Sequence, residues 1–420
     1  MLNAPRIQDV KIEDGFWEAR LRVNRETTLP DVYAKCRKSG RIDAFRLNWK
    51  PGRPNRPHKF WVSDVAKWLE GACYSLATHP DPKLERAVET VVDLIASAQQ
   101  PDGYLNTHFT VVEPDRRWAN LRDDHELYCA GHLMEAAVAH YEATGQTKFL
   151  DVVCRYADYI DSVFGRGRGR KRGYPGHEEI ELALVRLYRA TGRPRYLKLA
   201  AYFVNERGQQ PHYFEKEARA RGESPSVYRS IAHFGKQAHL PVREQTTADG
   251  HAVRAVYLYA GMADVAAETG DRELLAACRR LWRNIVTRRM YIHGGIGSTC
   301  HGERFTVDYD LPNAEAYAET CAAIGLVFFA HRMLNIDPDR RYADVMERAL
   351  YNNVLSGVSL DGNRFFYPNY LDAVPGVNSL RGLKSSARQD WYNTSCCPTN
   401  ICRMLASLGR YSSRRRHQRS

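Results

Sequence analysis

Two short stretches of the 420-residue chain together supply three thiols and one carboxylate. The first, NTSCCPTN at residues 393–400, contains the neighbours Cys396 and Cys397, whose mutual disulfide would close a strained ring. The second, AETC, places Glu319 two residues before Cys321. One carboxylate and three thiolates are a donor set that suits a tetrahedral zinc site. Spacing alone leaves a second interpretation equally open, in which three buried free cysteines accompany an unrelated glutamate.

Three histidines are candidates for a shared pocket. His132, His177 and His251 each follow a glycine at the predicted start of a helix, so all three would project from one rim of the molecule. One such histidine is more often a helix cap or a packed core residue, but three at equivalent positions favour a common site. Glu319 and Cys321 occupy a fourth equivalent position. Because residues two apart point about 200° away from each other on a helix, both reach one point only from a first turn or the preceding loop.

These side chains need a scaffold, and helical hairpins recur along the chain. Three segments begin with Gly-His, run through apolar residues spaced by three and four, turn at Thr-Gly and enter a second helix. Residues 61–98 and 313–356 follow the same plan, and residues 20–36 and 398–410 predict single helices. The sequence therefore predicts roughly twelve helices in six pairs, which form either a closed ring or an open solenoid.

The lengths of the loops favour the ring. The turns inside each pair are short, whereas the connections between pairs are long and rich in Gly, Pro, aromatic and His residues, as in YIHGGIGSTCHGERFTVDYDLPN. In a ring of antiparallel helices these long connections gather on one rim, which is where binding and catalytic residues usually lie. We therefore predict an all-α (α/α)6 barrel with its site at that rim. A solenoid with a concave binding surface is the alternative.

Composition limits the other classes. The chain is 44% hydrophobic, has no apolar run of about 18 residues and starts without the basic and apolar regions of a signal peptide. Its ten cysteines are scattered through helical patterns, which favours a reducing, cytoplasmic location. Much of the net charge of +12 lies in two runs, GRGRGRKRG and SSRRRHQRS, that lack interleaved aromatics. We therefore expect neither a nucleic-acid nor a membrane partner.

Several of these motifs resemble those of one family. CCPTN, AETC, HGERF and the Gly-His repeats are similar to the β-L-arabinofuranosidases of glycoside hydrolase family 127, and they occur in the same order. The resemblance extends from VKIEDGFWEARLRVNRETTLP to MLASLGRY, which is nearly the whole chain. It implies an (α/α)6 barrel, followed in the family by β-sandwich domains. It also implies a retaining glycosidase that acts on glycosides or oligosaccharides with terminal β-L-arabinofuranosyl residues.

The resemblance assigns roles to particular residues. The implied ligands of a Zn²⁺ ion are Glu319, Cys321, Cys396 and Cys397. The implied nucleophile is Cys396 and the implied acid/base is Glu303, in HGERF. The histidines that match the family's sugar pocket are His132, His177 and His251. This chemistry is coherent, because zinc deprotonates a thiol and fixes its position, while a carboxylic acid can protonate the departing oxygen and later activate water.

The end of the chain departs from the family pattern. The last helix is followed by the charged stretch SSRRRHQRS and not by a sandwich domain. We therefore expect a catalytic barrel over residues 1–410 and a basic tail over residues 411–420, with the family's C-terminal domains absent. Two alternatives to an active enzyme stay open. One is a truncated barrel that binds carbohydrate without turnover, and the other is a helical-repeat interaction protein with a structural zinc.

Overall fold

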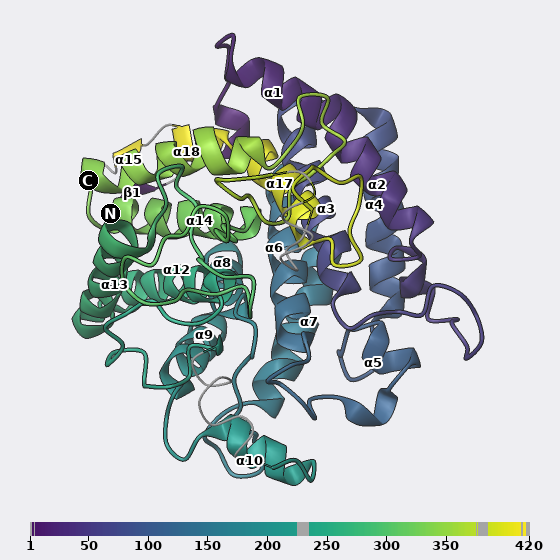
Figure 1. The fold of residues 1–420 in the computed structure, drawn as a ribbon. Helices are drawn as coiled ribbons and strands as arrows, with labels where there is room; N and C mark the ends of the chain where they lie inside the picture. Colours follow the sequence, from purple (N-terminus) through teal and green to yellow (C-terminus); the bar gives the residue numbers. More distant parts are fainter. Residues whose placement is uncertain are drawn as a thin grey trace.

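The protein is described by a computed structural model in which helices make up nearly all of the regular structure. The described residues are 2–3, 5–224, 235–374, 376, 385–412 and 415–416. Within them the single strand pair is very short: β1 (Leu2–Asn3) runs antiparallel to β2 (Arg415–Arg416), which brings the two ends of the described chain together (Figure 1). The predicted all-α class is confirmed. None of the described helices is long and apolar enough to cross a bilayer.

Six helices form a closed inner ring in the described part of the chain. They are α3 (Trp61–Thr78), α6 (Glu126–Thr144), α8 (Ile180–Thr191), α12 (Ala252–Thr269), α14 (Thr320–Ile336) and α17 (Cys396–Ala406). Each packs against the next in this order, and α17 packs against α3 as well as α14 (Figure 1). Because the last member of the series returns to the first, the architecture is a barrel and not an open solenoid.

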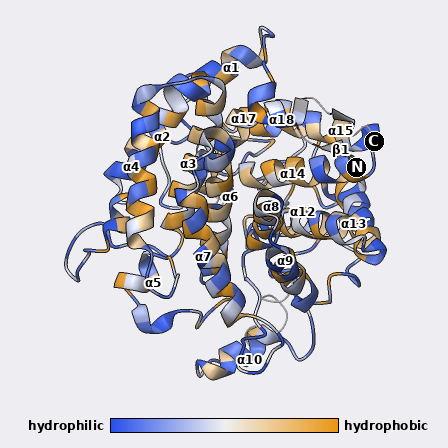
Figure 2. Ribbon diagram, turned by 180° about the vertical axis from the view of Figure 1, so that it is seen from behind, coloured by the Kyte–Doolittle hydropathy of each residue, from blue (hydrophilic) through white to orange (hydrophobic). Residues whose placement is uncertain are grey.

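An outer layer covers this ring. Five outer helices each follow an inner one: α4 (Pro82–Ala98), α7 (Lys148–Val163), α9 (Pro194–Glu206), α13 (Arg272–Asn284) and α15 (Arg340–Arg348). The sixth outer position is filled by α1 (Trp17–Val23), a π-helical turn (Asn24–Thr28) and α2 (Leu29–Lys38), which contact α17. In Figure 2 hydrophilic residues alternate with apolar ones along outer helices such as α4, while α14 is mainly apolar. The two predicted single helices, residues 20–36 and 398–410, thus pack together as the sixth outer and inner positions of the barrel.

Short elements complete the structure. They are α5 (His108–Val111), α10 (Tyr213–Ala220), α18 (Gly409–Ser412), two further π-helical turns (Ile285–Arg289, Ala349–Val354) and 3-10 turns at Ile7–Asp9, Asp43–Arg46 and Pro114–Arg116. Most of the predicted tail, residues 411–420, lies outside the described residues, and the division of the chain at residue 410 stays a prediction.

The turns inside the hairpins follow from local sequence. The inner helices α6, α8 and α12 end at the predicted Thr-Gly pairs, where Gly145, Gly192 and Gly270 adopt left-handed backbone conformations with φ of 72°, 67° and 71°. Glycine is the residue that takes this conformation without steric cost. Aspartates cap the outer helices α4, α13 and α15. Asp271, for example, accepts a hydrogen bond from the backbone N–H of Leu274 at the start of α13.

The inner helices approach each other closely at glycines. A Cβ atom on Gly325 of α14 would lie 2.5 Å from Cγ2 of Val256 on α12, closer than side chains tolerate. A Cβ on Gly71 of α3 would lie 3.1 Å from the Cα of Arg403 on α17. These contacts hold the ring narrow, so the first turns of α14 and α17 come near enough for their side chains to meet.

Candidate active site

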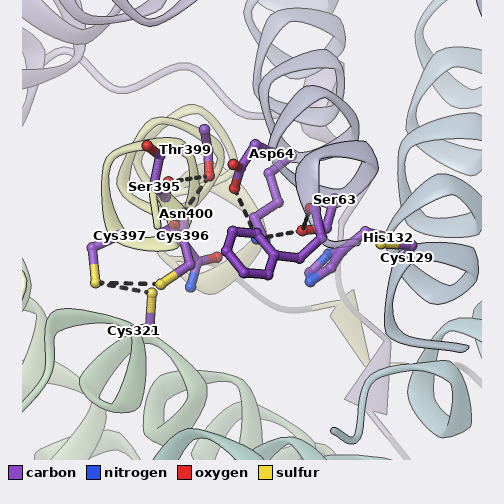
Figure 3. Close-up of polar contacts among 12 residues, drawn as sticks. Ser63, Asp64, Cys129, His132, Cys321, Ser395, Cys396, Cys397, Thr399 and Asn400 are labelled. Carbon is purple, nitrogen blue, oxygen red and sulfur yellow. Dashed lines mark hydrogen bonds and ion pairs between the residues drawn. The ribbon is translucent and has the colours of Figure 1, made fainter. Parts of the chain in front are cut away.

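Four ligating side chains converge where α14 and α17 begin. Glu319 is the N-cap of α14 and Cys321 lies in its first turn, while Cys396 and Cys397 are the first two residues of α17. One carboxylate oxygen and the three sulfurs all lie within 4.8 Å of one another. Figure 3 shows the three sulfurs gathered between the two helix starts. The predicted first-turn geometry of Glu319 and Cys321 is therefore present, and the cluster could hold a metal ion.

The spacing of these atoms fits a tetrahedral metal site. Sγ of Cys397 lies 3.2 Å from Sγ of Cys321 and 3.9 Å from Sγ of Cys396. Oε1 of Glu319 lies 3.5 Å from Sγ of Cys397 and 3.6 Å from Sγ of Cys396. Zinc–sulfur bonds of about 2.3 Å place two sulfurs about 3.8 Å apart across a tetrahedron, so small adjustments would complete the site. All ten cysteines of the chain, including these three, are free thiols.

The three thiols differ in their electrostatics. Hydrogen bonds from the thiols of Cys321 and Cys397 hold the pKa of Cys396 well below its usual value, and the buried Lys67 ammonium adds to this effect. Burial raises the pKa of both Cys321 and Cys397. Sγ of Cys396 also lies 3.2 Å from the hydroxyl of Tyr367, and this contact lowers the pKa of Cys396 further. Cys396 is thus the thiol that the surroundings favour as a thiolate.

A second carboxylate adjoins the cluster. Oxygens of Glu303 and Glu319 and a ring nitrogen of His251 also lie within 4.8 Å of one another. Nε2 of His251 lies 2.9 Å from Oε2 of Glu303, and the hydroxyl of Tyr317 donates to Oε1 at 2.6 Å. The backbone of Glu303 has a left-handed φ of 53°, and its carbonyl accepts from the N–H of Ala252 at 3.0 Å. Glu303 therefore presents a carboxylate with both oxygens held beside the thiol cluster.

A row of histidine rings leads away from Glu303. The ring of His251 lies 5.7 Å from that of His177, which lies 5.5 Å from that of His125. These residues stand at or just before the starts of α12, α8 and α6. Burial, followed by the charge of Arg254, lowers the pKa of all three histidines. Neutral imidazoles can both donate and accept hydrogen bonds, which suits the hydroxyl groups of a sugar.

The predicted position of His132 is wrong. Helix α6 begins at Glu126, so His132 lies well inside the helix and not at its start. Its side chain is fully buried, with Nδ1 3.0 Å from Oε1 of Glu179, and Figure 3 places it away from the thiols, beside Cys129. Burial lowers the pKa of His132 and raises that of Glu179, so it disfavours the charged form of both side chains. His125, which follows an aspartate and not a glycine, occupies the rim position instead.

The sequence patterns did not predict a role for two tyrosines of the site. Tyr317 holds Glu303, Tyr367 holds Cys396, and their rings lie 6.3 Å apart. Between Tyr317 and Glu319 the backbone of Ala318 is left-handed, with a φ of 40°, which turns one side chain to the carboxylate and the other to the thiols. The only signal in the sequence was proximity to the AETC motif, and the aromatic run containing Tyr367 also suits a core.

The described residues also line a cavity of about 560 Å³ on the axis of the ring. Its lining comes from the C-terminal halves of the inner helices and includes Glu70, Arg186, Asp264 and Arg403. Because the thiol cluster lies at the N-terminal ends of α14 and α17, this cavity belongs to the opposite end of the barrel. Its charged side chains are paired with one another, as Glu70 is with Arg186 and Arg403. The thiol end therefore remains the candidate active site.

Comparison with known proteins identifies the family of the chain. A family model described as "Beta-L-arabinofuranosidase, GH127 catalytic domain" matches residues 9–410. A non-reducing end β-L-arabinofuranosidase of Bifidobacterium longum subsp. longum is 46% identical over 361 residues, which is 84% of this chain and 55% of that protein. The chain thus spans little more than half the length of this relative.

Solved structures give the same result. The crystal structure of a GH127 β-L-arabinofuranosidase from Geobacillus stearothermophilus T6 matches with a TM-score of 0.92 at 51% identity, covering 95% of this chain and 65% of that one. A further GH127 β-arabinofuranosidase matches at 0.88 and 42% identity, covering 98% of this chain and 62% of that one. A cellobiose 2-epimerase from Bacillus thermoamylovorans, 10% identical with a TM-score of 0.50, shares the helical-barrel fold alone.

Proposed function

Because the chain belongs to glycoside hydrolase family 127, the β-L-arabinofuranosidases, we propose that it is a retaining glycosidase that releases terminal β-L-arabinofuranosyl residues. The nucleophile is Cys396 and the acid/base is Glu303. The observation that carries the proposal is the meeting of a thiolate-favouring cluster with a carboxylate that both His251 and Tyr317 hold in place.

The metal in this proposal is zinc. It is held by Glu319, Cys321, Cys396 and Cys397, whose donor atoms and spacing suit a tetrahedral ion. When bound, zinc keeps the thiols deprotonated at neutral pH and tempers their basicity. The buried positions of Cys321 and Cys397 suit purely structural ligands, while the partly exposed Cys396 can also reach a substrate.

The steps follow from the positions of the side chains. Sγ of Cys396 attacks the anomeric carbon while Glu303 gives a proton to the departing oxygen, so a carbon–sulfur bond forms as the glycosidic bond breaks. Glu303 then takes a proton from water, whose oxygen displaces the sulfur and restores the original configuration. Hydrogen bonds from His251 and Tyr317 fix the carboxylate for both steps. His177, His251 and His125 bind the hydroxyl groups of the sugar.

Turnover of an aryl β-L-arabinofuranoside tests the proposal. Both Cys396→Ser and Glu303→Gln should lower kcat by at least about 10³-fold, since each removes a group that acts on the reacting bond. Cys402→Ser is the matched control, because Cys402 lies further along the same helix with its thiol turned to the carbonyl of Thr399, and it should stay near the unmodified protein. Proton NMR of the first product should show the β-anomer.

The metal is tested separately from turnover. Elemental mass spectrometry of the purified protein should find about one zinc per chain, and Cys397→Ser should abolish it. If the protein retains zinc and binds the sugar but does not turn over the substrate, it is a carbohydrate-binding barrel and not an enzyme. A folded protein that turns over substrate without any bound metal would refute the role of zinc.

A further inference from the structure

Arg254, close to His251 of the candidate site, has no hydrogen-bond or ion-pair partner among the described residues. It lies in the first turn of α12, three residues after His251. Within the described part of the chain its guanidinium makes no hydrogen bond and no ion pair, and its Nε is buried. The side chain as a whole is partly buried. Because a buried donor without a partner is costly, a native protein rarely keeps one unless water or a ligand completes it.

The surroundings place Arg254 beside the histidine row. Its charge lowers the pKa of His251, His177 and His125, which are the rings that lead away from Glu303. The carboxylates whose charge acts on it are Glu178, Glu303 and Asp123. Each has another cation or donor: Glu178 pairs with Arg207 at 2.8 Å, Glu303 contacts His251 at 2.9 Å, and Asp123 contacts Arg122 at 2.6 Å. These carboxylates thus contact other side chains directly, and none of them forms an ion pair with Arg254 among the described residues.

A second cation reinforces it. Lys236 is nearly buried, and its only described ion-pair partner is Asp123, at 3.6 Å between Nζ and Oδ1. Burial, followed by the charge of Arg254, lowers the pKa of Lys236 to about 7. Lys236 lies close to the start of α12, because the backbone N–H of His251 donates to the carbonyl of its neighbour Gly235 at 3.3 Å. An anion placed between Arg254 and Lys236 would relieve both.

We propose that Arg254 and Lys236 form a recognition site for a carboxylate on the substrate, adjoining the catalytic carboxylate Glu303. The inference rests on the glycosidase function proposed above and adds to it that the substrate carries an acid. A guanidinium binds a carboxylate through two parallel hydrogen bonds, a geometry that neutral hydroxyl groups do not supply. The lysine adds a second, less directional contact.

Paired substrates test this site. The probes are the ortho-, meta- and para-carboxyphenyl β-L-arabinofuranosides and their methyl esters, which have nearly the same shape without the charge. For at least one isomer, the ratio of kcat/KM for acid over ester should be roughly ten- to a hundred-fold higher in the unmodified protein than in Arg254→Gln. Comparing ratios between two proteins cancels the different leaving-group chemistry of acid and ester. Lys236→Met should lower the ratio by a smaller factor.

The controls separate charge recognition from general damage. Arg272→Gln removes an exposed arginine from the start of α13 and should keep the unmodified ratio. If Arg254→Gln slows acid and ester by the same factor, the arginine serves the sugar ring or the fold, and the proposal is wrong. Thermal unfolding of each variant identifies a loss of folding.

Binding keeps the inference independent of turnover. Calorimetric titration measures binding without catalysis. Cys396→Ser is titrated with each carboxyphenyl β-L-arabinofuranoside and with its methyl ester. Tighter binding of the acid, lost in the double variant Cys396→Ser/Arg254→Gln, supports the carboxylate site even if no arabinofuranoside is hydrolysed. Equal affinity for acid and ester, or binding of neither, overturns it.

Discussion

At the scale of single residues, His125 and His132 share helix α6 and differ in what they contact. His125 stands at the N-cap position and is partly exposed beside His177, whereas His132 is fully buried against Glu179. His125→Ala should therefore raise KM for an arabinofuranoside about tenfold, because it removes a hydrogen-bonding ring from the pocket. His132→Ala should instead lower the free energy of unfolding by about 2 kcal/mol or more, since it opens a cavity and strips Glu179 of its partner.

Steady-state kinetics and urea unfolding of the two variants check this assignment. The opposite pattern, with His132→Ala weakening substrate binding and leaving stability intact, would restore the Gly-His prediction. Both variants change the same residue type on one helix, so each serves as the control for the other.

The ligand cluster was predictable at this scale and the histidine row was only partly so. Cys396, Cys397, Glu319 and Cys321 combine chemistry with a position at helix starts, and side chains at such positions meet when two helices are neighbours. For α6 the Gly-His pattern gave the wrong start, because a helix that is buried on all sides has no polar stripe to mark where it begins. Residues 126–140 are all buried, so the polar residues Glu126 and His132 both lie inside the barrel and neither marks an exposed face.

At the scale of elements, the distance between α12 and α14 is set by Gly325. An added methyl group there would meet Val256 and the ring of Tyr257. Gly325→Ala should lower the free energy of unfolding by about 1–3 kcal/mol, because one helix must move away from the other. It should also weaken metal binding, since α14 carries Glu319 and Cys321. Urea titration and competition with a zinc chelator measure the two effects.

Gly15→Ala is the matched control for this change, because a Cβ there has no neighbour within 4 Å. It should alter neither stability nor metal retention by more than experimental error. Equal behaviour of the two variants would show that the inner helices have room to adjust.

The helices and their turns were predictable, while the connections that shape the site were not. Apolar spacing and Thr-Gly pairs mark each hairpin through local energetics. The left-handed residues Glu303 and Ala318 instead owe their conformations to tertiary contacts, such as the hydrogen bond from Ala252 to the carbonyl of Glu303. Non-glycine residues adopt this conformation only when the surroundings impose it, so no local pattern announces it.

At the scale of the whole molecule, Arg403 joins the two ends of the helical series. It extends from α17 to Glu70 on α3, at 2.7 Å, and to the hydroxyl of Tyr257 on α12, at 3.1 Å. Although burial opposes it, the charges of Arg403 and Arg186 hold the pKa of Glu70 below its usual value. Arg403→Met should lower the free energy of unfolding by about 3–5 kcal/mol, because it leaves Glu70 charged and underpaired in the interior.

The double variant Glu70→Gln/Arg403→Met provides the comparison. It should recover a substantial part of that loss, since it removes the stranded charge along with its partner. Urea unfolding of both single variants and the double variant completes the cycle. Losses that simply add would show that the pair does not act as a unit.

The closure of the ring also governs the order in which the site can form during synthesis. Helix α17 is the last of the inner helices along the chain and the first to touch both α14 and α3. When the first five inner helices have been synthesised, the nascent chain contains only Glu319 and Cys321 of the four proposed metal ligands. Two ligands bind a metal weakly, and the ring of inner helices is still open where α17 will pack between α14 and α3. In the proposed metal site, binding of the ion therefore waits for the same helix that closes the barrel, and until α17 is made the inner helices form an unclosed arc.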